Sequence, residues 1–423
     1  MIDARLIRND TDRVRDALAR RGAAEDLDTF LELDAERRSL LATVEQRRAD
    51  ANAAAKEIGK AKQEGRDTAE AIALQTELKR AVADDETRLA TVEADLRLVH
   101  LRIPNIADPS APDGAADEDA VTLKTVGEPP SFGFEVRDHL QLAGPEGLGL
   151  IDTENAARVS GARFHYLLGD LVRVEFALVG WGMDKLSRLG FTPVVPPVLV
   201  REPAMEGTGM FPEARDQVYT VPEDELFLVG TAEVPLASLH GGAILDSDAL
   251  PMRYVGFSTC FRREAGAAGK DTRGIFRVHQ FDKLEMFVYC LPEESGAVHE
   301  ELLAIEEEIA QELGFHYRVQ NIAVGDLGAS AAKKYDIEVW LPGQERYREL
   351  TSCSNCTDYQ ARRLDIRYRA ESGPRHVHML NGTAVTSSRT LLALIEYGQQ
   401  ADGSIAFPEV LQPYGAPALI PAR

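Results

Sequence analysis

The clearest hydrophobic pattern lies between residues 28 and 102, a stretch without proline and with almost no aromatic residues. In its second half, seam positions recur at alternating steps of three and four: Gln75, Leu78, Val82, Asp85, Leu89, Val92, Leu96 and Val99. A weaker series in the first half comprises Leu33, Leu40, Val44, Ala51, Ala54 and Ile58. This spacing is typical of a coiled coil. It predicts two antiparallel helices, each about 45 Å long at ~1.5 Å per residue, joined by a polar turn at residues 59–67.

The pattern changes after residue 103. Residues 104–120 are rich in proline and acidic residues, which indicates a linker. Residues 163–190 carry apolar positions at helical spacing and end at Gly190, as a helix does. Strands are predicted at residues 191–200, 225–239, 251–264, 277–290 and 346–355. The expected fold class is α+β, with a long antiparallel coiled-coil hairpin in residues 1–103, the linker, and an antiparallel sheet flanked by helices in residues 121–423.

Composition narrows the class of protein. The formal net charge of -22 argues against a broad positive surface that coats nucleic acid nonspecifically, although a local basic groove stays compatible with it. The first residues lack the order of a signal peptide, and no apolar run approaches membrane-spanning length. The four cysteines fit a reduced interior better than a disulfide framework. We expect a soluble, cytoplasmic protein.

One stretch, FRREAGAAGKDTRGIFRVHQF at residues 261–281, gathers arginines at both ends of a glycine-containing loop. It reads as a hairpin with Arg262 and Glu264 on one face of the first strand, and Arg277 and Phe281 on the second. A guanidinium group donates two parallel hydrogen bonds to phosphate, and a phenyl ring offers a surface on which a base can stack. The alternative is a surface hairpin with cross-strand ion pairs. The sequence has no P-loop lysine motif and no dinucleotide-binding glycine pattern.

Two further features have a functional and a structural interpretation. Basic residues gather near the tip of the helical hairpin, either as a solvated charged face or as a surface for a nucleic-acid backbone: Arg47, Arg48, Lys56, Lys60, Lys62 and Arg66. The pair Cys353 and Cys356 suggests zinc, but a structural zinc site needs four ligands, and Cys260 and Cys290 are isolated in the sequence. We therefore favour buried thiols and expect no structural zinc.

Taken together, these residues resemble the bacterial seryl-tRNA synthetases, a family of class II aminoacyl-tRNA synthetases, over nearly the whole chain. The three class II motifs correspond to GFTPVVPPVLV with Pro197, to FRRE through RVHQFDKLE, and to LNGTAVTSSRTLLALIE with Arg389. TAE at residues 231–233 and ELTSCSN at residues 349–355 resemble the serine enzymes in particular. The third motif lacks the glycine run of many relatives, although Arg389 keeps its distance from Asn381.

The resemblance implies roles for the matching positions. The catalytic residues are Arg262, Arg277, Glu349 and Arg389. ATP contacts are expected from Arg262, Arg263, Glu264, Arg277, Val278, Phe281, Glu349, Leu350, Thr351, Ser352 and Arg389, with Phe281 and Arg389 on the two sides of the adenine. Serine contacts are expected from Thr231, Ala232 and Glu233 at the amino group, and from Glu285, Asn381 and Thr383 at the hydroxyl. Glu349 and Ser352 are expected to hold Mg²⁺ between the phosphates.

The implied activity is the formation of seryl-adenylate from serine and ATP, followed by transfer of serine to the 3′ end of serine tRNA. Selenocysteine tRNA is a second acceptor suggested by the resemblance. Residues 1–103 would bind the long variable arm of the tRNA, residues 121–423 would catalyse the reaction, and the first motif would form a homodimer. The rival functions are an aminoacyl ligase that loads a carrier protein, a synthetase for another amino acid such as threonine or proline, and a non-catalytic RNA-binding protein.

Overall fold

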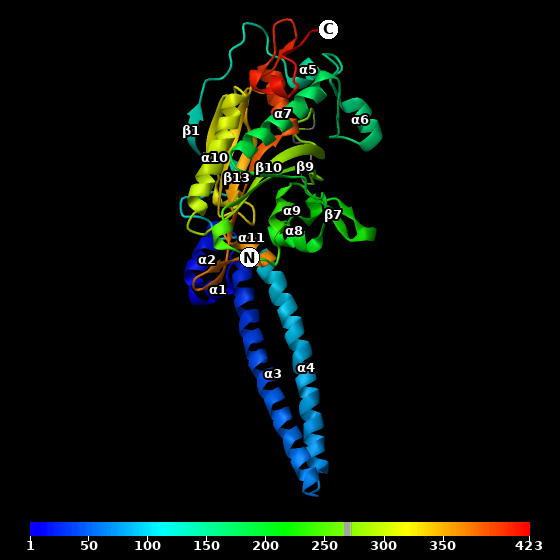
Figure 1. The fold of residues 1–423 in the computed structure, drawn as a ribbon, viewed down its shortest axis with the longest axis vertical. Coiled ribbons are helices and arrows are strands. Elements are labelled where there is room, and N and C mark those ends of the chain that lie inside the picture. Colours follow the sequence, from blue (N-terminus) through cyan, green and yellow to red (C-terminus); the bar gives the residue numbers. More distant parts are fainter. Residues whose placement is uncertain (266–270, 272) are drawn as a thin grey trace. The chain divides into compact units, whose positions relative to one another are not determined.

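The computed structural model describes residues 1–265, 271 and 273–423, and the chain divides into two compact units (Figure 1). The first unit, residues 3–103, consists of helices α1 (Ala4–Asn9), α2 (Thr11–Arg20), α3 (Glu25–Gln63) and α4 (Ala69–Arg102). The helices α3 and α4 lie side by side, as the hydrophobic pattern predicts. Their 39 and 34 residues make helices of roughly 58 and 51 Å, longer than expected.

The burial of the seam confirms the coiled-coil prediction residue by residue. Val44, Ala51 and Ile58 of α3 and Val92 and Val99 of α4 are buried. The remaining seam positions are half-buried, while most of the positions between them are exposed to solvent. The predicted turn at residues 59–67 is too long, because Gly59 lies inside α3 and the chain reverses only after Gln63. Gly65, with a φ of 67°, supplies the left-handed residue of that reversal.

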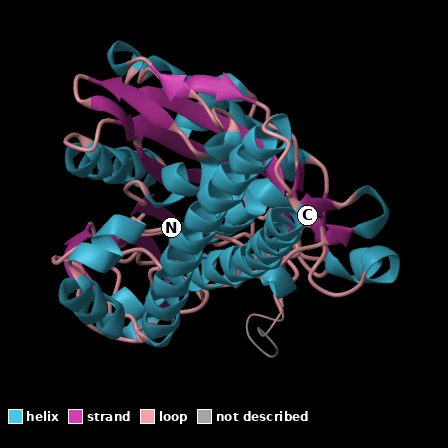
Figure 2. Ribbon diagram, turned by 90° about the horizontal axis from the view of Figure 1, so that it is seen from below, coloured by secondary structure: helices cyan, strands magenta, loops and turns pink. Residues whose placement is uncertain are grey.

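The second unit, residues 1–2 and 104–423, is built on an eight-stranded sheet. Neighbouring strands are antiparallel except for β4, which runs parallel to β9 at one edge. Figure 2 shows strands gathered into one layer with helices beside it. The order across the sheet is β1 (Val121–Val126), β11 (Tyr317–Asn321), β12 (Lys333–Leu341), β13 (Arg346–Asn355), β16 (His378–Thr386), β10 (Gln280–Cys290), β9 (Met252–Phe261) and β4 (Thr192–Val194).

Shorter elements surround this sheet. The helices are α5 (His139–Ala143), α6 (Thr153–Ser160), α7 (Asp170–Arg188), α8 (Glu202–Thr208), α9 (Glu233–Ser238), α10 (Ser295–Glu312), α11 (Tyr359–Leu364) and α12 (Ser387–Tyr397). The small sheets contain β2 (Ile151–Asp152) with β3 (Tyr166–Leu167); β5 (Leu199–Arg201), β7 (Leu226–Leu228) and β6 (Thr220–Val221); β15 (Gly373–His376), β14 (Arg367–Ala370) and β8 (Ile244–Leu245); and β17 (Ile405–Ala406) with β18 (Leu419–Ile420). Turns of 3₁₀ helix lie at Asp117–Asp119, Arg215–Gln217, Pro222–Asp224, Ser247–Ala249, Val324–Asp326 and Glu409–Tyr414.

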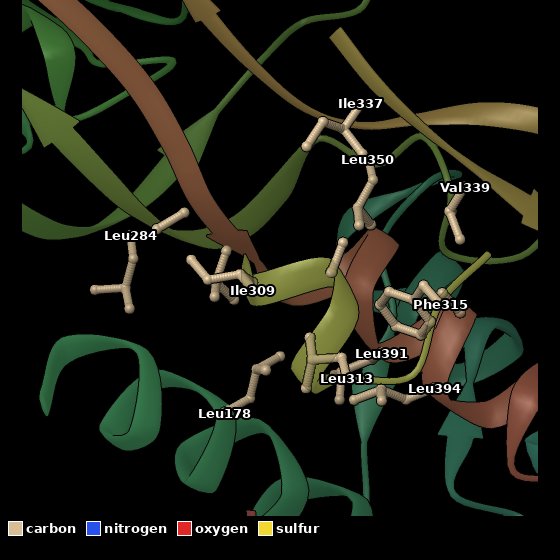
Figure 3. Packing of buried hydrophobic residues seen from close by; sticks show 14 of the residues in the cluster. Leu178, Leu284, Ile309, Leu313, Phe315, Ile337, Val339, Leu350, Leu391 and Leu394 are labelled. Carbon is tan, nitrogen blue, oxygen red and sulfur yellow. The ribbon is translucent and has the colours of Figure 1, made fainter. Parts of the chain in front are cut away.

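The main hydrophobic core fixes three helices against the large sheet (Figure 3). Leu178 of α7, Ile309 of α10 and Leu391 of α12 are buried together with Leu284 of β10 and Leu350 of β13. Because α12 begins directly after β16, this packing also fixes where the first turn of α12, which carries Arg389, meets the sheet.

Several predicted elements differ from the observed ones. The helix predicted at residues 163–190 begins only at Asp170, because residues 166–167 pair as β3; its end is confirmed, with Gly190 at a φ of 86°. The strand predicted at residues 225–239 is β7 followed by the helix α9. The run at 191–200 is split between β4 and β5, as its three prolines require. The strand predicted at residues 346–355 is confirmed in full as β13.

The predicted linker is ordered against the sheet unit. The Asn105 side chain is buried and donates hydrogen bonds to the carbonyl oxygens of Ser330 and Cys356, at 2.9 Å each. Ala107 and Ala111 are also buried, in a small apolar cluster with Ile322. The first part of this segment, up to Ala111, is therefore packed structure, whereas residues 115–119 are exposed to solvent. No helix in the described part of the chain is long and apolar enough to cross a membrane.

Candidate active site

The arginine-rich hairpin is formed by β9 and β10, whose last antiparallel pair is Phe261 with Gln280. Arg262, Glu264 and Arg277 therefore lie beyond the strands, and the prediction that they alternate on a strand face is wrong. Glu264 has a φ of 51°, a backbone turn that brings its carboxylate to the Arg277 guanidinium. Residues 266–270 and 272 of the predicted loop lie outside the described part of the chain.

A cavity at the base of this hairpin collects side chains from four segments that are distant in sequence. The hairpin contributes both of its ends, β13 contributes its middle, and the region where β16 meets α12 contributes the rest. The cavity is lined by Arg262, Glu264, Phe276, Arg277, Val278, Phe281, Lys283, Glu349, Leu350, Ser352, Thr383, Thr386, Ser388 and Arg389. It unites three arginines with two carboxylates and two aromatic rings, a composition suited to a polyanion that carries a flat base.

Two of the three arginines of the cavity lie over aromatic rings. The Arg262 guanidinium carbon lies 5.2 Å from the centre of the Phe281 ring. Arg389 lies 4.8 Å from the centre of the Phe276 ring, and Arg348 covers the same ring at 3.7 Å. The sequence interpretation placed Phe281 and Arg389 on the two sides of the adenine and did not include Phe276, which stands directly before Arg277 in the hairpin.

Glu349 and Ser352 present oxygen atoms to this cavity. Arg389 donates a hydrogen bond to the Glu349 backbone oxygen at 3.1 Å and pairs with its carboxylate at 3.2 Å. Loss of hydration alone would raise the pKa of Glu349, but the positive charges of Arg389, Lys334 and Arg262 outweigh it and hold that pKa well below its usual value. An ionised carboxylate beside a hydroxyl is a donor set that fits Mg²⁺, which prefers hard oxygen ligands and takes the rest of its ligands from phosphates and water.

A second group of predicted residues forms a cluster of hydrogen-bonded polar side chains around Glu233 at the start of α9, called the Glu233 pocket below. Glu233 Oε1 accepts hydrogen bonds from Gln360 Nε2 at 2.7 Å and from Asn381 Nδ2 at 3.1 Å. The Glu233 amide donates to Thr231 Oγ1 at 3.2 Å, and that hydroxyl lies 3.4 Å from Glu285 Oε2. Burial, and then the nearby negative charge of Glu285, raise the pKa of Glu233 to about 7. The sequence interpretation missed Gln360, which no local pattern connects with Glu233.

Lys283 joins the pocket to the cavity and was also missed from the sequence. Its ammonium forms an ion pair with Glu285 and lies 3.4 Å from Thr383 Oγ1, while its side chain also lines the cavity. Lys283 and Glu285 are two residues apart on β10, so they share one face of the strand. In the sequence, this spacing of two residues was the one indication that Lys283 and Glu285 lie next to each other.

Three residues expected to contact ATP or serine do not present their side chains to the cavity or to the Glu233 pocket. Arg263 does not line the cavity, and its amide donates to the Gln217 carbonyl oxygen at 2.9 Å. The Thr351 hydroxyl is buried and donates to Glu306 Oε2 at 3.0 Å, away from Glu349 and Ser352. Ala232 is fully buried in an apolar cluster with Leu236, so it can offer a ligand only its backbone.

The two remaining predictions concern the basic residues of the helical hairpin and the four cysteines. Near the tip of the helical hairpin, Arg47, Arg48 and Arg66 form ion pairs with Asp85, Glu86 and Glu64. Lys56, Lys60 and Lys62 are exposed to solvent on α3. The four cysteines are free and buried, which confirms the prediction of buried thiols. In the described residues, no group of three or more histidine, cysteine, aspartate or glutamate side chains is arranged to hold a metal ion.

Comparison with known proteins agrees with this geometry. Residues 1–107 match the seryl-tRNA synthetase N-terminal domain, and residues 218–397 match the class II tRNA synthetase core domain of the glycine, histidine, proline, serine and threonine enzymes. The chain is 49% identical to the serine–tRNA ligase of Thermobifida fusca, over 98% of this chain and 97% of that protein. It is 48% identical to the serine–tRNA ligase of Acidothermus cellulolyticus, over the full length of both.

Solved structures give the same result. The crystal structure of seryl-tRNA synthetase from Pyrococcus horikoshii complexed with ATP matches with a TM-score of 0.93 and 42% identity, over 100% of each chain. The cytoplasmic serine–tRNA ligase of Naegleria fowleri in complex with AMP matches with a TM-score of 0.85 and 34% identity, over 97% of this chain and 96% of that one. The resemblance inferred from the sequence motifs is confirmed, and this chain belongs to the seryl-tRNA synthetase family of class II aminoacyl-tRNA synthetases.

Proposed function

We propose that this chain activates serine with ATP and transfers the serine to tRNA. The observation that carries the proposal is the adjacency of two sites: an arginine-lined cavity suited to a triphosphate, and a cluster of polar side chains with two carboxylates, Glu233 and Glu285, suited to a small amino acid that carries a hydroxyl. Lys283 and Thr383 belong to both, so the carboxylate of a bound serine and the α-phosphate of ATP would meet where the two sites join.

In the first step, a serine carboxylate oxygen attacks the α-phosphorus. The bond from phosphorus to the bridging oxygen breaks, and its electron pair leaves on pyrophosphate. Arg262, Arg277 and Arg389 stabilise the negative charge that builds on the phosphates, and this charge stabilisation and the positioning of the reactants supply the catalysis. Phe281 and Arg389 lie on the two sides of the adenine. Mg²⁺, held by Glu349 and Ser352, would further neutralise phosphate charge.

In the second step, a terminal ribose hydroxyl of the tRNA attacks the carbonyl carbon of seryl-adenylate. The carbonyl bond to the phosphate oxygen breaks, AMP leaves, and the hydroxyl proton passes to the phosphate or to solvent. Neither step needs a nucleophile from the protein. Residues 1–103 form the tRNA-binding domain in this proposal, and residues 121–423 form the catalytic core. The chain acts in the cytoplasm.

The proposal includes a homodimer formed through the first class II motif. Phe176 of α7 and Val195, which follows β4, are large apolar side chains that are 67% and 79% exposed. Val195 lies within GFTPVVPPVLV, and Phe176 lies in the long helix that precedes it and that the family resemblance includes in this motif. Exposed apolar side chains of this size favour a protein–protein interface.

ATP–pyrophosphate exchange tests the function directly. Purified protein is assayed with Mg²⁺ and with serine, threonine, alanine or glycine in separate reactions. We expect exchange that depends on serine. Exchange with alanine or glycine in place of serine would favour the carrier-protein ligase, and exchange with threonine would favour another class II specificity. Absence of exchange with every amino acid would leave RNA binding by the helical hairpin as the function.

The raised pKa of Glu233 predicts a pH dependence of serine binding. In the empty pocket Glu233 is about half protonated near pH 7, and the serine ammonium requires its ionised form, so binding releases a proton below that pH. The KM for serine should rise about tenfold for each pH unit well below 7 and level off above it. Calorimetry in buffers of different ionisation enthalpy measures the released proton. The Glu233→Gln variant should release none, and an equal release from this variant would contradict the assignment.

The basic tip of the helical hairpin predicts a separable effect on tRNA. The triple variant Lys56→Ala, Lys60→Ala and Lys62→Ala should raise the KM for tRNA roughly tenfold at moderate salt, because each lysine removed is one fewer phosphate contact. Its serine-dependent pyrophosphate exchange should equal that of the unmodified protein. Unchanged charging kinetics at two salt concentrations would show that the lysines are only a solvated face.

A further inference from the structure

The position of Lys283 raises a question that the proposed function leaves open. Lys283 is a buried cation, 6% exposed, on the central strand β10. Its ammonium pairs with Glu285 Oε2, the same oxygen that lies 3.4 Å from Thr231 Oγ1. A buried lysine loses its hydration and must have a compensating partner. The question is what this ion pair does for an enzyme that must bind a substrate cation close by.

The pocket contains two carboxylates, and their surroundings differ in charge. Glu233 receives hydrogen bonds from the neutral amides of Gln360 and Asn381, so its negative charge has no cation in direct contact. Glu285 has the ammonium of Lys283. The buried carboxyl group of Glu306 accepts a hydrogen bond from the Thr351 hydroxyl at 3.0 Å, and its pKa is raised well above the usual value, chiefly by burial.

A substrate ammonium could otherwise pair with either carboxylate, because both are ionisable, Glu285 being buried and Glu233 partly buried. Because the Lys283 ammonium offsets the negative charge of Glu285, a substrate ammonium gains more free energy by binding at Glu233 than at Glu285. Glu285 is then left as a hydrogen-bond acceptor for a neutral hydroxyl. Both of its protein contacts named above fall on Oε2, so Oε1 is the oxygen that we assign to the incoming hydroxyl.

We propose that Lys283 is a specificity-determining residue, which neutralises Glu285 so that this carboxylate accepts the serine hydroxyl while Glu233 receives the α-ammonium. The proposal rests on the proposed function, since it concerns how the same pocket orients serine. It assigns to Lys283 a part in substrate choice in addition to its place beside the ATP cavity.

The proposal makes a distinctive statement about a second substrate, L-2,3-diaminopropionate, which carries an ammonium where serine carries its hydroxyl. In the unmodified protein the Lys283 ammonium repels this group, so serine is strongly preferred. In Lys283→Met, a side chain of similar length without charge, Glu285 is uncompensated and attracts a cation. The ratio of kcat/KM for serine to that for diaminopropionate should then fall at least tenfold.

The experiment compares pyrophosphate exchange for the unmodified protein, Lys283→Met and the charge-retaining Lys283→Arg, with serine, alanine and diaminopropionate. We expect the Met variant to lose at least thirtyfold in kcat/KM for serine and to lose preference over diaminopropionate, an effect on amino-acid choice that is larger than any change in its KM for ATP. The Arg variant should keep the order of preference. If Lys283→Met is too slow for exchange, the same comparison is made by calorimetric Kd values for the sulfamoyl analogues of the aminoacyl-adenylates.

The outcomes separate the two proposals. No serine-dependent exchange by the unmodified protein would overturn the proposed function itself. Serine exchange by the unmodified protein, with the preference over diaminopropionate unchanged within threefold in Lys283→Met, would overturn only the role of Lys283. A uniform loss for all three amino acids accompanied by a raised KM for ATP would also overturn it, because Lys283 would then act on the nucleotide.

Discussion

Replacing Glu285 with alanine should lower serine-dependent pyrophosphate exchange by roughly 10²–10³-fold in kcat/KM. Two losses add: the serine hydroxyl loses its acceptor, and the buried ammonium of Lys283 loses its counter-ion. The binding of ATP alone should change little, since Glu285 is not among the residues that line the cavity. The measurement is exchange with varied serine, together with the Kd for ATP by calorimetry.

Glu285→Gln is the matched control for this variant. An amide keeps the volume and one oxygen acceptor, so it should recover part of the hydroxyl contact but not the compensation of Lys283. We expect its activity to lie between that of the alanine variant and that of the unmodified protein. Near-normal serine turnover in Glu285→Ala would contradict the assignment of this pocket to serine.

The periodic parts of the fold could be predicted from the sequence, because their causes are local. Burial at Val44, Ala51, Val92 and Val99 follows from a seam that repeats along each helix. The strand β13 was predicted in full from the turn residues Pro342 and Gly343 before it, although only Tyr347 and Thr351 within it are strong strand formers. Helix α9 was missed, since its short apolar run VPLAS has the length of a buried strand and too few turns to show a helical period.

The residues of the candidate site also divide into those that local motifs predict and those that they do not. The class II motifs identified Arg262, Glu349 and Arg389, which the fold brings to one cavity. The residues missed are those whose role depends on a distant partner. Gln360 contacts Glu233 across 127 positions of sequence, and no spacing rule connects the two. The sequence showed that Lys283 and Glu285 share one face of a strand. It did not show that Glu233, at the start of α9, lies near Glu285, and the role of Lys283 depends on that second carboxylate.

The second large effect is expected from Arg389. Its guanidinium lies over Phe276 and pairs with Glu349, so it both presents positive charge to the cavity and holds the carboxylate that we assign to Mg²⁺. Arg389→Ala should therefore lower kcat/KM for ATP in the exchange reaction by roughly 10²–10³-fold, the cost of about 3–4 kcal/mol typical of one lost charge-stabilising donor. The KM for serine should change much less, because Arg389 makes no contact in the Glu233 pocket among the described residues.

Arg389→Lys distinguishes charge from shape. A lysine keeps the positive charge but loses the planar, forked group that stacks on a ring and donates two parallel hydrogen bonds. Recovery of less than a tenth of the activity would show that the stacked geometry over Phe276 carries most of the effect. Arg346→Ala, an exposed arginine on the same sheet strand as Glu349, is the matched control and should change kcat/KM less than threefold. If Arg389→Ala stayed within fivefold of the unmodified protein, the triphosphate would have to be held by Arg262 and Arg277 alone, and the cavity would need a different orientation of ATP.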